Sequence, residues 1–300
     1  MVAIRPHDVE SYRREGFLIV PDVLTPAEVN ELRQVTDEFV ERSRAVTSHT
    51  EMFDLEDGHT PAEPRLRRIV SPHRWHPIFA AMVRHLGIVE ILRALWGPSI
   101  RFDQSKLNMK SGGFGSPVEW HQDWAFYPHT NDDLAAVGIM IDDADLGNGP
   151  MLVIPRSHMG PIYDHHTDGR FCGAIDVARS DLDVSSAVPC VGGAGTITVH
   201  HTRLVHGSAP NRSARPRRFL LHQYRAADAW PLMRWPGDWD SWTSLLVSGE
   251  ETLMPRLEPV PVRLPLPPAE NPGSIYENQR QLRSRFFAGP GASSQRTISR

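Results

Sequence analysis

The strongest constraint on the fold is a series of short strand-like segments between residue 100 and about residue 225. Gly, Pro, Asn and Asp separate these segments, and no helical pattern lies between them. The segments are IRFDQSKLNMK, PVEWHQDW, LAAVGIMI, MLVIP, GTITVHH and RRFLLHQYRA. Several short strands with turn signals and no intervening helix are typical of a β-sandwich or barrel. The sequence therefore predicts a mainly β structure beyond residue 100.

The first 97 residues instead predict helices around one short strand. Residues 7–16 are amphipathic and end at a glycine, and the following FLIVPDVL indicates a buried strand and a turn. A longer helix is expected from Thr25, which suits an N-cap because Pro26 follows it and Glu28 completes a capping box.

Two polar stretches and one apolar stretch complete the local predictions. Residues 47–68 contain two prolines and no periodicity, which predicts a loop. Residues 76–95 carry apolar side chains at helical spacing and predict a helix that Gly97 and Pro98 end. Residues 161–190 form a long polar insertion, and loops of this length are usually lids or binding loops.

The length of 300 residues is ample for a sizeable core. We expect a single domain over residues 1–290, with N-terminal helices at about 7–97 and the barrel at about 100–265. The last residues, 291–300, are expected to form a flexible tail because they are rich in Gly, Ser and polar side chains.

Composition and charge exclude several classes of protein. The net charge is −4 and no basic stripe stands out, so nucleic acid is not an expected partner. No run of about 18 apolar residues and no signal-peptide core is present, so neither a membrane partner nor secretion is expected. Two cysteines cannot form a disulfide framework, which suits a cytoplasmic protein. Four tryptophans near the C-terminus are compatible with core packing, pocket lining or a homodimer contact.

The segment WHQD is the most informative motif for chemistry. The chain has 15 histidines, and His121 and Asp123 stand two residues apart on an expected strand, so both side chains leave the same face. A third imidazole would complete the 2-His-1-carboxylate triad of non-haem Fe(II) oxygenases. Taken alone, such a pair is a weak signal, because a His and an Asp at this spacing more often lie in an exposed turn. Three downstream histidines, His200, His201 and His206, compete for the third position.

Several motifs in order resemble one known family. WHQD, DADLGNGPMLVIPRSHMG and VHGSAPNRSARPRR, with the opening GFLIVPDVLTPAEVNELR, are similar to the phytanoyl-CoA dioxygenase family, which uses Fe(II) and 2-oxoglutarate. The likeness spans roughly residues 8–225. It implies a mainly β fold of the α+β class: a double-stranded β-helix, which is a cupin-like jelly-roll barrel, with flanking helices. This fold agrees with the strand pattern described above. Arg156 stands where the family usually has a glycine, which leaves the turn geometry there uncertain.

The resemblance also implies a set of site residues. His121, Asp123 and His206 match the metal ligands and hence the catalytic centre. Arg217 matches the arginine that pairs with the distal carboxylate of 2-oxoglutarate, and Ser208 stands where a hydroxyl can assist it. The neighbouring Arg218 would point the other way on a strand and is the weaker candidate.

Further binding residues are expected around this core. Gln122 matches the residue between the two proximal ligands and is assigned to the co-substrate site. Lys106 is also assigned to the co-substrate, and Gln104 and Asn108 to the substrate, because the three share one face of their strand. That assignment requires the face to point inward; an outward-facing edge strand is the alternative. Trp124 is expected to shape the mouth and contact substrate.

The implied activity is that of an Fe(II)- and 2-oxoglutarate-dependent dioxygenase using O2. It would hydroxylate an unactivated C–H bond of a small organic molecule, in secondary metabolism or catabolism, and release succinate and CO2. Asp123 disfavours halogenation, because halogenating relatives lack that carboxylate, while desaturation, epoxidation and ring chemistry stay open. The alternatives are a non-catalytic sensor of 2-oxoglutarate or metal on the same barrel, and a zinc hydrolase.

Overall fold

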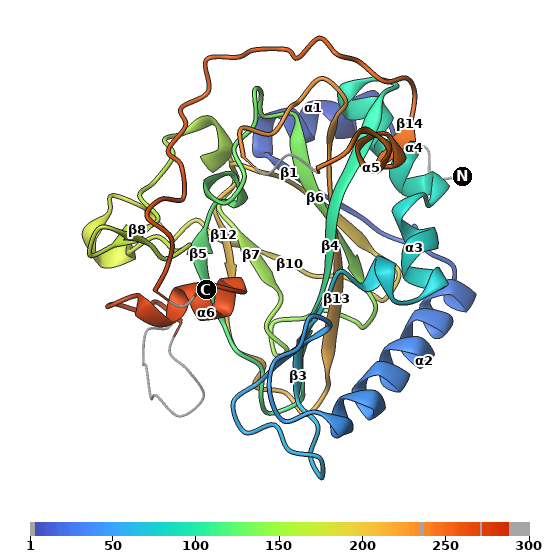
Figure 1. Cartoon of the computed structure of the whole chain (residues 1–300), viewed down its shortest axis with the longest axis vertical. Coiled ribbons are helices and arrows are strands. Elements are labelled where there is room, and N and C mark those ends of the chain that lie inside the picture. Colours follow the sequence, from blue (N-terminus) through green and yellow to red (C-terminus); the bar gives the residue numbers. More distant parts are fainter. Residues whose placement is uncertain (1–3, 234–236, 271, 288–300) are drawn as a thin grey trace.

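The computed structural model describes residues 4–233, 237–270 and 272–287, and its main strands form two antiparallel sheets (Figure 1). The larger sheet contains, in spatial order, β1 (Phe17–Val20), β11 (Ile197–His201), β6 (Leu134–Met140), β13 (Arg217–Ala226), β4 (Ile100–Lys110), β3 (Leu66–Val70) and β2 (Phe53–Leu55), with β14 (Leu246–Ser248) beside β4. The smaller sheet contains β10 (Val188–Cys190), β7 (Met151–Val153), β12 (His206–Ser208) and β5 (Val118–His121). A separate hairpin consists of β8 (His166–Thr167) and β9 (Arg170–Phe171).

The two sheets pack face to face as the halves of a jelly-roll barrel, which confirms the predicted fold class. One buried cluster joins the inner faces, with Phe219 and Leu221 from the larger sheet against Met151 and Val153 from the smaller. The side chains between the sheets therefore form the barrel interior, and any site there is enclosed on two sides.

Strand alternation divides the larger sheet into two different faces. In β4 and its neighbour β13, Leu107 and Leu220 lie opposite each other and join the main hydrophobic core outside the barrel. The residues between them, such as Lys106 opposite Leu221, point to the other face and into the barrel. The predicted inward direction of the Gln104, Lys106 and Asn108 face follows from this register.

The four N-terminal helices cover the outer face of the larger sheet (Figure 1). They are α1 (Pro6–Glu15), α2 (Pro26–Arg42), α3 (Pro77–Val83) and α4 (Leu86–Trp96). Two short helices, α5 (Trp239–Ser244) and α6 (Ile275–Asn278), lie in the C-terminal segment. The predicted start of α2 is confirmed, since Thr25 and Glu28 form the capping box and Pro26 opens the helix. No helix in the described ranges is long and apolar enough to cross a membrane.

Two local predictions were wrong. The expected loop at 47–68 contains β2 and β3, which extend the larger sheet beyond β4; three- and five-residue strands are too short to show a clear alternation. The single helix expected over 76–95 is two helices, because the chain turns at Arg84 and His85. Leu86, which completed the apolar spacing, is exposed.

Arg156 illustrates why a glycine is usual at its position. Its φ angle is +68°, in the left-handed region that L side chains rarely adopt. Its side chain lies outside the barrel and forms an ion pair with Glu15 at the end of α1, with Nε 3.3 Å from a carboxylate oxygen. The substitution therefore leaves the barrel interior unchanged.

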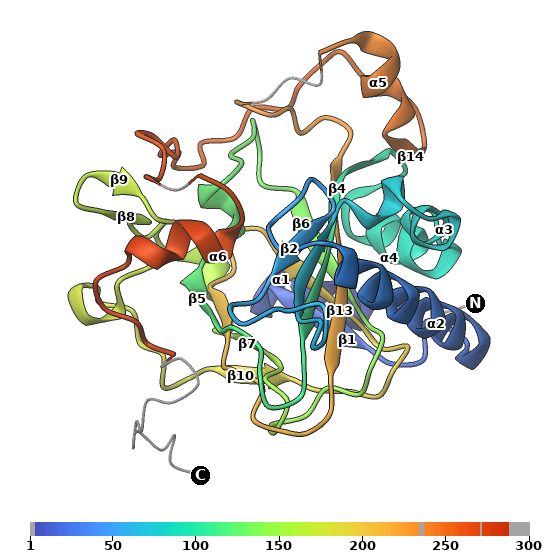
Figure 2. The ribbon, with the colours of Figure 1, turned by 60° about the horizontal axis from the view of Figure 1, so that its bottom comes forward.

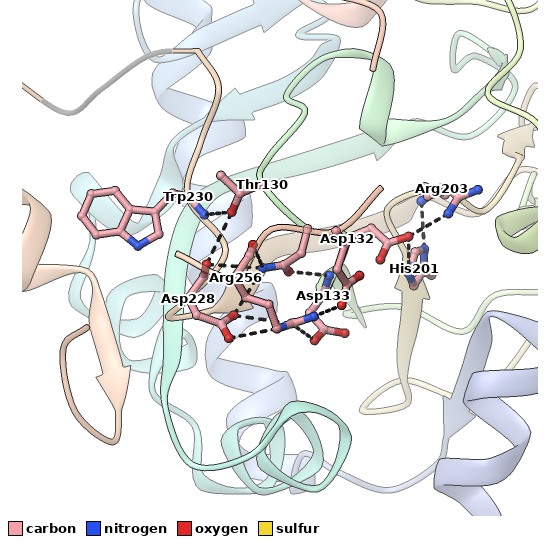
Figure 3. A network of polar contacts seen from close by, with 10 residues as sticks. Thr130, Asp132, Asp133, His201, Arg203, Asp228, Trp230 and Arg256 are labelled. Carbon is pink, nitrogen blue, oxygen red and sulfur yellow. Dashed lines mark hydrogen bonds and ion pairs between the residues drawn. The ribbon is translucent and has the colours of Figure 1, made fainter. Parts of the chain in front are cut away.

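The C-terminal segment crosses the open end of the barrel and returns along its side (Figures 1 and 2). Arg256 anchors it through ion pairs to Asp133 at the start of β6 and to Asp228 after β13, as Figure 3 shows. Farther on, Gln279 accepts a hydrogen bond from the Glu119 amide of β5 at 3.0 Å, which places α6 against the smaller sheet. The predicted tail at 291–300 lies outside the described residues.

Gly207 allows β12 and β5 to approach closely. A Cβ atom at this position would lie 3.0 Å from the Val118 carbonyl oxygen and 2.9 Å from the Phe287 ring. We expect Gly207→Ala to lower the free energy of unfolding by about 1–3 kcal/mol, because backbone cannot yield as a flexible side chain does. Urea unfolding measures this change.

Gly193→Ala is the matched control, since its new Cβ would have no neighbour nearer than 3.9 Å. It should change stability by less than about 0.5 kcal/mol. Equal stability of the two variants would contradict the close approach of β12 and β5.

Candidate metal centre

Two adjacent strands of the smaller sheet bring the predicted metal ligands together. His121 ends β5 and lies directly opposite His206, which begins β12. The strand stops at His121, but Gln122 keeps an extended backbone, so Asp123 still projects to the same side before a short 3-10 turn begins. The candidate ligand atoms of the three residues all lie within 4.8 Å of one another, and all three side chains are buried.

The two imidazoles are oriented by their own backbones. The Nδ1 of His121 is 2.8 Å from the Glu119 carbonyl oxygen, and the Nδ1 of His206 is 2.9 Å from that of Leu204. A carbonyl only accepts, so each Nδ1 carries the proton and donates it. Each Nε2 is then left with its lone pair toward the centre, which is how histidine ligands are usually prepared.

The charges of the three groups suit a divalent cation. Burial lowers the pKa of His121 and of His206 below the usual histidine value, so both rings are neutral at pH 7. Burial alone would raise the pKa of Asp123, but Lys106 and the surrounding imidazoles lower it more, so it is held well below its ordinary value. Two neutral nitrogen donors and one carboxylate are the donor set of a non-haem Fe(II) site.

The other two candidate histidines point to different places. His200 faces the barrel interior, where its Nε2 lies 3.9 Å from Asp123 and its ring centroid 4.7 Å from that of His206. His201 faces outward, with its Nε2 3.8 Å from Asp132, which also pairs with Arg203 (Figure 3). His201 thus belongs to a largely buried polar network outside the barrel, and His200 lies beside the centre.

Beyond the three ligands the same cavity is basic. Arg217 is buried, and its guanidinium makes one hydrogen bond, to the Gly149 carbonyl at 3.0 Å, while its Nε has no partner. Lys110 lies opposite Arg217 in the sheet register and donates to Ser208 Oγ at 2.8 Å. Burial lowers the pKa of Arg217 to about 10, so it remains a cation. Neither cation has an ion pair within the described part of the chain.

The side chain of Arg218 points away from the cavity, as expected for the residue that follows Arg217 on a strand. It points out of the barrel, where its guanidinium pairs with Asp142 and with Asp37 of α2, both at 2.7 Å. Its charge is therefore neutralised outside the cavity.

Two predicted binding residues serve the surrounding structure instead. Gln122 is fully buried, and its amide donates to the carbonyls of Pro161 and Arg203 and accepts from the Tyr163 amide. The indole of Trp124 donates to the Pro261 carbonyl at 2.9 Å and packs beside Leu134. Neither lines the cavity that contains the three ligands. Gln122 and Trp124 are next to the ligands His121 and Asp123 in the sequence, but their side chains do not point into the cavity as those of the two ligands do.

Two cavity residues were missed by the sequence reasoning. Lys110 continues the inward series of Gln104, Lys106 and Asn108 by two more residues, so alternation alone identifies it. Tyr276 of α6 also lines the cavity, and burial raises its pKa to about 12. No sequence pattern connects residue 276 with the barrel, because its place depends on the course of the C-terminal segment.

A second cluster of possible ligands is already used in ion pairs. His49, Asp54 and Glu277 also lie within 4.8 Å of one another. The Arg67 guanidinium binds the carboxylates of both Asp54 and Glu277 at 2.5 Å, and Arg280 also pairs with Glu277 at 2.8 Å. This group links the β2–β3 hairpin to α6.

Comparisons with known proteins identify the family of the chain. Residues 12–219 match the family model of phytanoyl-CoA dioxygenase. A probable alpha-ketoglutarate-dependent hypophosphite dioxygenase of Stutzerimonas stutzeri is 38% identical over 280 residues, which cover 92% of this chain and 97% of that protein. The L-proline trans-4-hydroxylase of Streptomyces griseoviridis is 29% identical over 243 residues, covering 71% of this chain and 83% of the relative.

A solved structure is similar over most of the chain as well. EvdO2 from Micromonospora carbonacea var. aurantiaca, complexed with 2-oxoglutarate, matches with a TM-score of 0.58 and 25% identity. The match covers 80% of this chain and 97% of EvdO2.

We expect Gln122→Ala to lose stability and to keep its affinity for 2-oxoglutarate. The substitution leaves three partly buried backbone groups without their partners, which should lower the free energy of unfolding by about 1–3 kcal/mol. Urea unfolding and titration of the metal-loaded protein with 2-oxoglutarate in the absence of oxygen measure the two quantities.

Gln34→Ala, which removes an exposed amide from α2, is the control and should be nearly neutral. A Gln122→Ala protein as stable as the parent but unable to bind 2-oxoglutarate would instead support the co-substrate role expected from the sequence.

Proposed function

From the premise that the chain belongs to the phytanoyl-CoA dioxygenase family, we propose that His121, Asp123 and His206 hold its catalytic iron. The chain is an iron- and 2-oxoglutarate-dependent dioxygenase, the class of its relatives. One observation supports this ligand assignment above all others: two neutral imidazoles, with each Nδ1–H already donated to a backbone carbonyl, present Nε2 toward one buried carboxylate.

Held by these residues, iron would supply, together with 2-oxoglutarate and O2, the oxidant that replaces a substrate hydrogen by a hydroxyl group, and 2-oxoglutarate would leave as succinate and CO2. The chain itself contributes the orientation of the two organic molecules, the exclusion of water and the charges that bind them.

We assign the far carboxylate of 2-oxoglutarate to Arg217, with Ser208 as a second donor. A buried guanidinium without a carboxylate partner requires a counter-ion, and a planar carboxylate can accept two of its N–H groups. Lys110 adds positive charge at the same end and holds the Ser208 hydroxyl. Asn108, whose buried side-chain oxygen has no partner, is available to a polar group of the bound molecules.

The bond that loses hydrogen is either C–H or P–H. The sequence predicts an unactivated C–H bond of a small organic molecule, and the proline hydroxylase is a relative of that kind. The 38% identical relative is named for hypophosphite, whose hydrogens are bound to phosphorus. We therefore propose hypophosphite as the first compound to test, followed by small organic molecules. The cytoplasmic location predicted from the sparse cysteines belongs to the same proposal; both cysteines are free and buried.

The iron assignment predicts that His121→Ala and Asp123→Ala lose both iron and activity. The protein is loaded with Fe(II) without oxygen, bound iron per chain is measured, and succinate is measured after oxygen and 2-oxoglutarate are added. Each variant should retain well under one iron per chain and form no succinate above background, since removal of one of three protein ligands typically costs far more than the 10–100-fold seen for an outer partner.

His7→Ala, which removes an exposed histidine, should bind and turn over as the parent does. Full iron content and normal succinate release in either ligand variant would overturn the assignment. One iron per chain in the parent with no succinate from any compound would favour the sensor instead.

The co-substrate assignment predicts that Arg217→Met weakens 2-oxoglutarate binding by about 10–100-fold while iron content is unchanged. Calorimetric titration of the iron-loaded protein without oxygen measures the affinity. Arg212→Gln removes an exposed arginine from the preceding turn and is the matched control. Unchanged affinity in Arg217→Met would place the far carboxylate elsewhere.

A further inference from the structure

A second cavity adjoins the metal centre. It has a volume of about 300 Å³ and shares Lys106, Asp123 and Ile275 with the cavity around the three ligands. Its other walls come from β3, from the loop after β5 and from the C-terminal segment at Pro265 to Gly273. Because Asp123 lies on the boundary, a molecule in this second cavity is adjacent to the proposed iron.

Two cations reach this cavity from neighbouring strands. Arg68 of β3 lies opposite Asn108 of β4, and Lys106 of β4 lies opposite Val70 of β3. Directly opposite residues share a face, and so do residues two apart on one strand. Arg68 and Lys106 are therefore diagonal neighbours on the inward face, and both line the cavity.

Neither cation has a close, hydrogen-bonded counter-ion among the described residues. In the described residues the Arg68 guanidinium makes no hydrogen bond, and its one ion pair is a distant contact from Nε to Asp54 Oδ2 at 3.6 Å. The other oxygen of Asp54 is bound by Arg67 at 2.5 Å. Lys106 makes neither a hydrogen bond nor an ion pair in that part of the chain. Burial lowers the pKa of Lys106; the nearby Asp123 carboxylate partly opposes this, and Arg68 adds to it as a like charge.

Two like charges that converge on one cavity, with only one distant ion pair between them, are unfavourable unless an anion joins them. The carboxylate of Asp123 is close to Lys106 but is committed to the metal centre. We propose that Arg68 and Lys106 form a subsite for an oxyanion, and that the substrate of the dioxygenase carries a carboxylate or phosphorus oxyanion head group that binds there. The substrate class rests on the proposed function; the anion subsite itself does not.

The other residues that line the second cavity indicate the chemical nature of the rest of the substrate. Phe126, Phe171 and Leu266 provide apolar surface, and Gln104 and Asn278 provide polar groups. The cavity is about ten times the volume that one water molecule occupies in the liquid, taking roughly 30 Å³ for water. A small oxyanion fills only part of it, so the cavity has room for an organic portion beside the charged group.

Arg68 separates this subsite from that of 2-oxoglutarate. Arg68 lines the second cavity and is absent from the lining of the first, whereas Arg217 and Ser208 line only the first. Lys106 stands at the junction and contacts both spaces. Substitution of Arg68 therefore tests the substrate subsite alone.

The experiment measures binding without turnover. Iron-loaded protein saturated with 2-oxoglutarate is titrated without oxygen by calorimetry, with pentanoate against pentanamide and butylphosphonate against its dimethyl ester. Each pair keeps the apolar portion and removes the charge. The parent protein should bind the anions about 10–100-fold more tightly than their neutral counterparts, as expected for a charge-assisted hydrogen bond in a largely buried site.

Three variants test whether Arg68 is responsible for the preference for anions. Arg68→Gln should lose most of the preference for the anions and keep the parent affinity for 2-oxoglutarate. Arg68→Lys keeps the charge and should retain a clear preference even where the glutamine variant folds poorly. Arg65→Gln removes a nearby arginine that pairs with Glu63 and lines neither cavity, so it should behave as the parent does.

Equal binding of anions and neutral counterparts by the parent would overturn the subsite. So would an Arg68→Gln protein that keeps the preference, or one that loses 2-oxoglutarate instead. Absence of 2-oxoglutarate binding to the iron-loaded parent would contradict the proposed function. In that case the preference of the same protein for anions over their neutral counterparts would still show whether the anion subsite exists.

Discussion

The pairing of His121 with His206 across β5 and β12 is the constraint on which the rest of the site depends. Directly opposite positions bring the two ring centroids within 4.1 Å, and each ring is oriented by a hydrogen bond to the carbonyl two residues earlier in the chain. The sheet register thus sets both the spacing and the protonation of the nitrogen donors. Gly207 permits that register, since a side chain there would meet the β5 backbone.

The interior of the barrel is also divided by charge. The smaller sheet contributes neutral imidazoles and, just after β5, the carboxylate of Asp123, whereas β3, β4 and β13 contribute Arg68, Lys106, Lys110 and Arg217. These four cations lie on the inward face of one sheet and have at most one weak ion pair among them in the described chain. Such an interior is stabilised by bound anions, which is consistent with a dicarboxylate co-substrate and an anionic substrate.

Local patterns in the sequence predicted a mainly β sandwich or barrel, the start of α2 from its capping box, and the shared direction of His121 and Asp123 from their i, i+2 spacing. The jelly-roll barrel and the choice of His206 as the third ligand came from the resemblance to the phytanoyl-CoA dioxygenase family. Alternation also distinguished Arg217 from Arg218. The features that the sequence analysis did not predict depend on contacts between segments that are far apart in the chain. β2 and β3 are short strands that exist by pairing with β4, Gln122 is used by loops at 161–163 and 203, and Tyr276 reaches the cavity through a long irregular segment.

A crystal structure of the protein grown without oxygen, with Fe(II) and 2-oxoglutarate present, tests the central claim most directly. The account predicts one iron bound by Nε2 of His121, Nε2 of His206 and the carboxylate of Asp123. It further predicts 2-oxoglutarate chelating that iron through its 2-oxo acid end, with its far carboxylate on Arg217. Iron bound through His200 in place of either histidine, or held at the His49, Asp54 and Glu277 group, would contradict it.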